Sequence, residues 1–312
     1  GNAGSMVLND KLETMGYRNV TAALDEKGAL QINGLFHDTT YTLTETRPAN
    51  GFVTAESIPF QLVEGENRQT LVAVLQGQEM TLQTDNIVRM VDDITKVEIS
   101  KTDITGSEEI PGCELEIKEK DTDTVIDAWT STEEKHLIGQ KFVVGRTYVL
   151  TEKRPADGYA TADSIEFTVE DTGEVQSVGM KDDTTKIRLI KLAGDTGQGL
   201  QGAKFEVYDK DNKLVLKFTS KEEGYDITGK LAVGETYTFR EVEAPKGYKL
   251  AKPVKYTVKD TGRVQKVSVT DEKTPKPKVP QTGGVTPFVM MAVLLFAFGG
   301  GIILFRRKRV CR

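Results

Sequence analysis

Apolar and polar residues alternate with a period of two along much of the chain. The alternation is clear at 204–208, where Lys-Phe-Glu-Val-Tyr places every second side chain on one side, and again at 254–258. In an extended strand successive side chains point to opposite faces, so this pattern predicts half-buried β-strands. Turn sequences such as Asp-Lys-Asp-Asn at 209–212 separate the runs. The chain is therefore predicted to be all-β, with short strands packed as sandwiches.

The same unit occurs three times. The segment 41–52 returns at 148–159 and 237–248, and the block 88–93 returns 90 residues later and then again after another 89. A period of about 90 residues is the size of a small domain and is longer than a solenoid repeat. The predicted domains are 1–94, 95–184 and 185–273.

The first predicted domain differs from the other two. Its segment 4–8 aligns with 112–116 of the second domain, so we expect its opening strand to lie upstream of residue 1. It has 47 residues from Glu45 to Asp92, where each later domain has 30 between the equivalent positions. The insertion, at about 65–86, is expected to form an extended hairpin or a surface loop.

The C-terminal region combines an apolar run with basic residues. The 18 residues at 288–305 carry no charge and precede the tail 306–312, which begins Arg-Arg-Lys-Arg. Such a run is just long enough to cross roughly 30 Å of hydrocarbon as a helix, with the basic cluster on the cytoplasmic side. The linker 274–278 is rich in Pro and Lys and is predicted to be extended.

A pentapeptide lies between the linker and the apolar run: Val279, Pro280, Gln281, Thr282 and Gly283. The whole segment 279–312 resembles the sorting signal of Gram-positive cell-wall-anchored surface proteins, although Val279 stands where that family most often has Leu. The resemblance implies a membrane-inserted precursor that a sortase cuts after Thr282. The sortase would then join Thr282 to an amine of the peptidoglycan cross-bridge or of a pilin, at the cell surface. A plain single-pass membrane protein is the alternative.

Composition argues against several kinds of partner and cofactor. The chain has 41 basic and 47 acidic residues and no large basic patch outside the tail, so no nucleic-acid partner is expected. The two histidines and two cysteines lack metal-ligand spacing, and no metal or cofactor is expected. Cys113 is expected to be a small core side chain. Residues 1–6 do not resemble a signal peptide, so the chain is expected to be the C-terminal fragment of a longer precursor.

Three ionisable residues fall on the inward face in each later domain. Lys101 continues the row of Val97 and Ile99, and the same parity directs Glu152 and Asp182 inward. The matching residues of the third domain are Lys191, Glu241 and Asp271, whereas the first domain retains only Glu45 and Asp92 as an incomplete site.

Burial explains what such a triad can do. It lowers the pKa of a lysine and raises that of a carboxyl, which favours the neutral amine and the neutral acid. A neutral amine is a nucleophile, and a second carboxyl can transfer protons. The pattern predicts a Lys–Asp isopeptide bond that each domain makes once on itself, without other enzymatic activity. The alternatives are a buried salt bridge and strand-end charges turned to solvent.

The segments 200–207, 237–241, 244–248 and 128–131 resemble Cna B-type, SpaA-like domains of Gram-positive adhesins and pilins. The resemblance implies a prealbumin-like (Ig-like) β-sandwich in which a first-strand Lys bonds a last-strand Asn or Asp under the influence of a Glu. On this chain it implies the bonds Lys101–Asp182 and Lys191–Asp271, assisted by Glu152 and Glu241.

We therefore expect a sortase-anchored surface stalk that holds an upstream functional head away from the cell. A minor or basal pilin subunit is the main alternative. A third possibility is an adhesin that binds a host or matrix ligand through the insertion of the first domain or a region upstream. Asp-Thr-Gly at 171, 195 and 260 suggests an aspartic protease, but two copies lie between alternating strands, where hairpin turns are the better interpretation.

Overall fold

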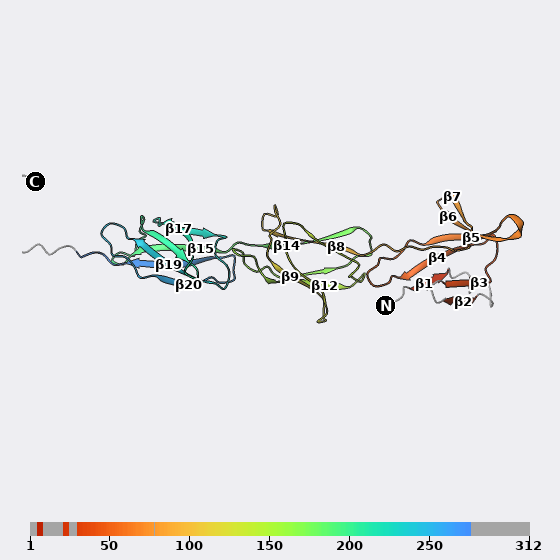
Figure 1. Cartoon of the computed structure of the whole chain (residues 1–312), viewed down its shortest axis with the longest axis horizontal. Helices are drawn as coiled ribbons and strands as arrows, with labels where there is room; N and C mark the ends of the chain where they lie inside the picture. The colour runs from red at the N-terminus through yellow and green to blue at the C-terminus, as the bar shows by residue number, and fades with distance from the viewer. Residues whose placement is uncertain (1–4, 9–20, 25–29, 78, 276–312) are drawn as a thin grey trace, which may run out of the picture. The chain divides into compact units, whose positions relative to one another are not determined.

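The computed structural model describes residues 5–8, 21–24, 30–77 and 79–275, and these form an all-β chain (Figure 1). The first domain contains β1 (Ser5–Leu8), β2 (Thr21–Leu24), β3 (Leu30–Asn33), β4 (Thr40–Arg47), β5 (Ile58–Glu64), the 3-10 turn η1 (Glu66–Arg68), β6 (Thr70–Gln76) and β7 (Glu79–Gln83). The second contains β8 (Lys96–Asp103), β9 (Glu114–Glu119), β10 (Val125–Thr130), β11 (His136–Gly139), β12 (Thr147–Arg154), β13 (Ile165–Thr168) and β14 (Val175–Asp182). The third contains β15 (Lys186–Ala193), β16 (Lys204–Tyr208), β17 (Leu214–Thr219), β18 (Tyr225–Thr228), β19 (Thr236–Glu243), β20 (Val254–Thr257) and β21 (Val264–Asp271).

The second and third domains share one topology. In the second, a four-stranded sheet of order β10-β9-β12-β13 packs against a three-stranded sheet of order β11-β8-β14. In the third, the corresponding orders are β17-β16-β19-β20 and β18-β15-β21. The first and last strands of each domain, β8 with β14 and β15 with β21, are parallel neighbours, whereas the other strand pairs are antiparallel. The ends of each domain are therefore hydrogen-bonded to each other.

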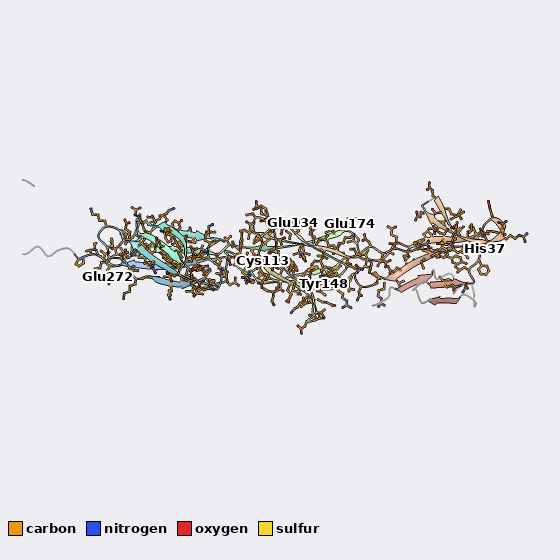
Figure 2. All side chains as sticks on the ribbon, in the orientation of Figure 1. His37, Cys113, Glu134, Tyr148, Glu174 and Glu272 are labelled. Carbon is orange, nitrogen blue, oxygen red and sulfur yellow. The ribbon has the colours of Figure 1, made fainter. Side chains whose placement is uncertain are left out.

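The predicted alternation of faces is confirmed. Val97, Ile99 and Lys101 are buried on β8 while the residues between them are partly exposed, and β15 repeats this pattern. The inward residues of the two sheets meet in one core per domain, in which Phe142 packs edge-on against Tyr148 at 4.9 Å between ring centres. Cys113 and Tyr148 both lie within the second domain (Figure 2), and Cys113 is fully buried, as predicted.

The first domain is built differently. Its main sheet has the order β1-β4-β5-β6-β7, and the inserted residues form the predicted hairpin from β6 and β7. β1 pairs with β4 so that Met6 lies opposite Glu45. In the second domain Leu115 lies opposite Glu152, so Met6 corresponds to Leu115. The alignment predicted for this strand was therefore wrong by one residue.

No strand forms at 87–92, the part of the first domain that corresponds to β14. In the second domain, β14 is hydrogen-bonded to β8 alone. The described residues of the first domain include no counterpart of β8, so this segment has no neighbouring strand with which to pair.

Two further expectations concern the turns and the C-terminal region. The Asp-Thr-Gly sequences at 171–173 and 260–262 are not hairpin turns, because β13 and β14, like β20 and β21, belong to different sheets. Nowhere in the described ranges is there a helix with the length and apolar character that crossing a membrane requires. The predicted helix 288–305, the motif 279–283 and the tail 306–312 lie outside the described residues.

Candidate functional site

The parallel pairing of β8 with β14 brings Lys101 and Asp182 together in the second domain. Lys101 lies opposite Met180 in the register, so Asp182 is two residues further along the neighbouring strand and on the same face. Lys101 Nζ contacts Asp182 Oδ1 directly, and the two side chains are 2% and 0% exposed. Glu152 reaches the same point from β12 in the opposite sheet, with its Oε1 3.0 Å from Lys101 Nζ.

The third domain repeats this arrangement. Lys191 Nζ contacts Asp271 Oδ1, and Glu241 Oε1 lies 3.1 Å from the same nitrogen. All three side chains are fully buried. The structure therefore brings together every Lys, Glu and Asp that was predicted to form a triad in the two later domains.

A backbone amide holds each glutamate in place. The Ala162 N–H donates to Glu152 Oε2 at 2.7 Å, and the Ala251 N–H donates to Glu241 Oε2 at 2.7 Å. Glu45 of the first domain is held in the same way by the Ala55 N–H at 2.9 Å. One oxygen of each carboxyl is thereby fixed, and in the later domains the other is directed at the lysine. The strand pattern does not predict this contact, although an alanine follows each glutamate by ten residues.

The electrostatics of the triads follow from burial. Burial raises the pKa of Asp182 to about 6, even though hydrogen bonding and attraction to Lys101 oppose the shift. Burial also raises the pKa of Glu241. Both shifts favour the protonated form of a carboxyl beside the lysine, as expected for an apolar site.

Cys113 distinguishes the second site from the third, which has Ala203 at the equivalent position. Burial raises the pKa of the Cys113 thiol to about 11, so the group stays a thiol, and its Sγ lies 3.8 Å from Asp182 Oδ2. Although Cys113, Glu152 and Asp182 offer ligand atoms within 4.8 Å of one another, Lys101 Nζ already lies against both carboxyls. The donor set therefore fits a lysine better than it fits a metal ion.

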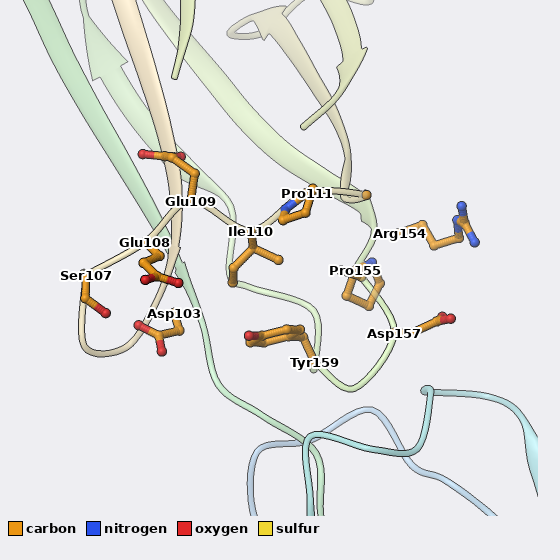
Figure 3. A pocket seen from close by; sticks show the side chains of 12 residues that line it. Asp103, Ser107, Glu108, Glu109, Ile110, Pro111, Arg154, Pro155, Asp157 and Tyr159 are labelled. Atoms are coloured by element: carbon orange, nitrogen blue, oxygen red, sulfur yellow. The ribbon is translucent and has the colours of Figure 1, made fainter. Parts of the chain in front are cut away.

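A surface pocket of about 630 Å³ lies beside the second site (Figure 3). Ile110 and Tyr159 face each other in it, and its acidic side carries Asp103 and Glu109. Asp103 Oδ1 accepts the backbone N–H of Thr105 at 2.9 Å. Glu109 Oε2 accepts the backbone N–H of Lys101 at 2.6 Å. These carboxylates therefore organise the β8–β9 loop, and Glu109 also holds the backbone of Lys101.

The first domain contains half of a site. Glu45 is buried and anchored by Ala55, as its counterparts are. Asp92 is only half-buried and lies in the segment that forms no strand, whereas Asp182 and Asp271 are fully buried at strand ends. Glu45 and Asp92 thus keep their sequence positions without the strand pair that assembles the later sites.

The triad geometry permits one reaction. Two ions held in an apolar interior lose more hydration than their attraction returns, unless the geometry is very good. Transfer of a proton from the ammonium to a carboxyl leaves a neutral amine in contact with a carboxylic acid, which is the pair that can condense to an amide. The anchored glutamate lies where a proton carrier is needed.

The two later domains, at residues 95–184 and 185–273, match the family model described as "SpaA: Prealbumin-like fold domain". The "Trypsin-resistant surface T6 protein" of Streptococcus pyogenes is 31% identical over 137 residues. The match covers 41% of this chain and 23% of that protein, so the chain spans about a quarter of this relative's length.

Two solved structures are similar at low identity. The Bacillus anthracis TIE protein is 18% identical with a TM-score of 0.38, covering 86% of this chain and 51% of that one. The shaft pilin SpaA of Lactobacillus rhamnosus GG is 16% identical with a TM-score of 0.30, covering 58% of this chain and 98% of that one. Both TM-scores lie below 0.5, so neither structure bears on the function of this chain.

Proposed function

This chain belongs to the family of SpaA prealbumin-like fold domains, and on that premise we propose that it is a self-crosslinking, sortase-anchored stalk of a bacterial cell surface. The observation that carries the proposal is the pair of buried Lys–Asp contacts, Lys101–Asp182 and Lys191–Asp271, each beside an anchored glutamate. An ordinary surface ion pair would need neither full burial nor a third, amide-held carboxyl.

The proposed reaction is a single condensation in each domain. Glu152 takes a proton from the Lys101 ammonium, and the freed amine attacks Cγ of Asp182. The Nζ–Cγ bond forms and one Cγ–O bond breaks. The departing oxygen leaves as water, with protons returned through Glu152. Ammonium and carboxylate thus become amide and water, and no other reactant or cofactor is needed. Glu241 has the same role between Lys191 and Asp271.

The bond has a mechanical consequence for the proposed stalk. Lys101 lies near the C-terminal end of β8, the first strand of the domain, and Asp182 ends β14, the last strand, so the crosslink joins the entry and exit strands. Force applied through the neighbouring segments then passes along a few residues of β8, through the amide and out of β14. The sandwich between them is not extended. Such a domain resists stretching by covalent bonds, where an uncrosslinked sandwich depends on hydrogen bonds between strands.

The C-terminal motif is proposed to attach this stalk to the wall. A sortase would cut between Thr282 and Gly283 and join Thr282 to an amine of the peptidoglycan cross-bridge, while the apolar run 288–305 holds the precursor in the membrane until then. The surface-protein name of the streptococcal relative is consistent with this location.

The intact mass of the full chain tests the crosslinks. We expect a value lower than the sequence mass by two waters, and peptide mapping should find Lys101 joined to Asp182 and Lys191 joined to Asp271. A mass equal to that of the sequence would refute self-crosslinking in both domains.

Cell fractionation of the Thr282→Ala variant tests the anchor. The wild-type chain is expected in the wall fraction after muramidase release, and the variant in the membrane fraction. A variant that still reaches the wall would refute the role of Thr282. Thr282-dependent ladders of high molecular mass that contain a second protein would instead indicate a minor or basal pilin subunit.

A further inference from the structure

The two Asp-Thr-Gly turns that link one sheet to the other are not used by the crosslinking sites. They lie at 171–173 in the second domain and at 260–262 in the third, at equivalent positions of the repeat. Each leads into the last strand of its domain, β14 or β21. Each also contacts the preceding domain through its aspartate.

The turn at 171–173 contacts the first domain through both of its ends. Asp171 Oδ1 accepts the backbone N–H of Thr54 at 2.7 Å. At the other end the link runs through Lys96 of the second domain, whose Nζ donates to the Gly173 carbonyl at 2.8 Å and binds the Asp93 carboxylate of the first domain at 3.0 Å. A Cβ added to Gly173 would lie 2.6 Å from Asp93 Oδ2, so a larger residue there would displace the Asp93 carboxylate.

The turn at 260–262 makes equivalent contacts with the second domain. Asp260 Oδ1 accepts the backbone N–H of Thr161 at 2.9 Å. A Cβ on Gly262 would overlap the carboxylate of Asp183, which is held by Lys186 Nζ at 2.7 Å. Two junctions thus use the same residue types at the same positions, although the first domain carries an insertion before its junction.

The amides that these aspartates bind belong to a short segment of the preceding domain, at 51–54 or 158–161, which we call the glycine corner. The glycine that begins it is hydrogen-bonded to the first residue of the next domain. Gly158 has a φ of 90°, and its carbonyl accepts the N–H of Thr185 at 2.8 Å. Thr185 is fully buried, and its hydroxyl donates to the Leu231 carbonyl at 2.7 Å. Gly51 has the same φ of 90° and accepts from Thr95 at 3.0 Å. The amide that meets the aspartate, Thr54 or Thr161, follows this glycine by three residues in both cases.

We propose that the Asp-Thr-Gly turn is an interdomain clasp, whose partner is the glycine corner of the preceding domain of the same chain. The aspartate binds the corner amide as a charged acceptor, which makes a stronger hydrogen bond than a neutral acceptor does. The glycine lets the turn approach the Asp–Lys pair at the domain boundary. The clasp restrains each domain against its N-terminal neighbour without a covalent bond, and it does not depend on the crosslinks.

The chain supplies a matched control. A third Asp-Thr-Gly, at 195–197, lies in the loop between β15 and β16, and its Asp195 pairs with Lys273 of the same domain at 2.7 Å. Replacing this aspartate removes the same side chain from the same tripeptide without touching a junction.

Hydrogen exchange measured by mass spectrometry on the full chain tests the clasp, comparing wild type with Asp260→Ala and Asp195→Ala. In Asp260→Ala, the peptide containing Thr161 is expected to exchange roughly tenfold faster, the factor that a lost charge-assisted hydrogen bond corresponds to. Peptides from β15 and β21 should be unchanged, and Asp195→Ala should leave Thr161 unchanged.

Gly262→Ala provides a second, independent variant, which should accelerate exchange at Thr161 while the aspartate is intact. Unchanged exchange at Thr161 in Asp260→Ala would overturn the clasp. Equal acceleration throughout the third domain would overturn it too, because it would show general destabilisation. Each of these variants is expected to have an intact mass two waters below its own sequence mass, as proposed for the wild type, so the clasp and the crosslinks succeed or fail separately.

Discussion

Replacing Lys101 by methionine removes the nucleophile of the second domain and keeps an unbranched apolar stem in its place. The proposed bond closes a loop whose ends are 81 residues apart. By analogy with a disulfide, such a loop reduces the entropy of the unfolded chain by an amount worth about 4.5 kcal/mol. For a domain of this size that corresponds to a melting temperature lower by roughly 20–35 °C.

The chain's single tryptophan, Trp129, makes the effect measurable in one domain alone. Trp129 lies on β10 of the second domain, so its fluorescence reports the unfolding of that domain within the full chain. Lys181→Met is the matched control, because Lys181 is the solvent-facing neighbour of Asp182 on β14. The reasoning would be refuted if Lys101→Met shifted the Trp129 transition no further than Lys181→Met, or if the variant kept the wild-type number of lost waters.

Three further predictions follow from the sites. The folded pKa of Asp182, about 6, is raised above its ordinary 3.8, so its proton is bound more tightly in the folded state and its contribution to stability falls as pH rises from about 4 through 6. The Lys101→Met variant, which cannot crosslink, should therefore lose free energy of unfolding as pH rises from 4.5 to 7.5, and it should lose more than the double variant Lys101→Met, Asp182→Asn. Urea unfolding followed by Trp129 fluorescence measures both, and an equal loss would contradict this. The intact mass of Glu241→Gln should be one water below its own sequence mass, where wild type is two waters below. Peptide mapping should find only the Lys101–Asp182 bond. Loss of both bonds, or of neither, would contradict independent sites. Asp182→Asn should release ammonia and reach the same crosslinked mass as wild type, because the amide formed is identical, whereas Asp182→Ala should lack that bond.

The repeat and the strand parity were readable from the sequence because both depend on local pattern. Lys101 falls in step with Val97 and Ile99, and a strand that buries those two must also direct the lysine inward. The anchoring of Glu152 by the Ala162 amide was not predictable, since it depends on how the loop after β12 folds back. The same holds for the Asp-Thr-Gly turns: their neighbouring strands looked like hairpin arms until the structure placed those strands in different sheets.

The unformed strand at 87–92 shows a further limit of pattern reading. Its sequence matches β14, yet whether a strand forms depends on a partner elsewhere in the chain. Local periodicity predicts which face of a strand a residue would occupy, but it does not predict whether a neighbouring strand is present for pairing.

The parallel pairing of the first and last strands also determines when, during synthesis, a domain can form the proposed bond. A ribosome makes β8 first and β14 last, and the 80 or so residues between Lys101 and Asp182 take roughly 4–16 s to synthesise at 5–20 residues per second. Throughout that interval the lysine has no aspartate to react with, so a domain whose synthesis stops early carries no bond. Under the proposed reaction, each domain can crosslink only once its own last strand exists. The proposed bond would therefore mark a domain that was synthesised to its end.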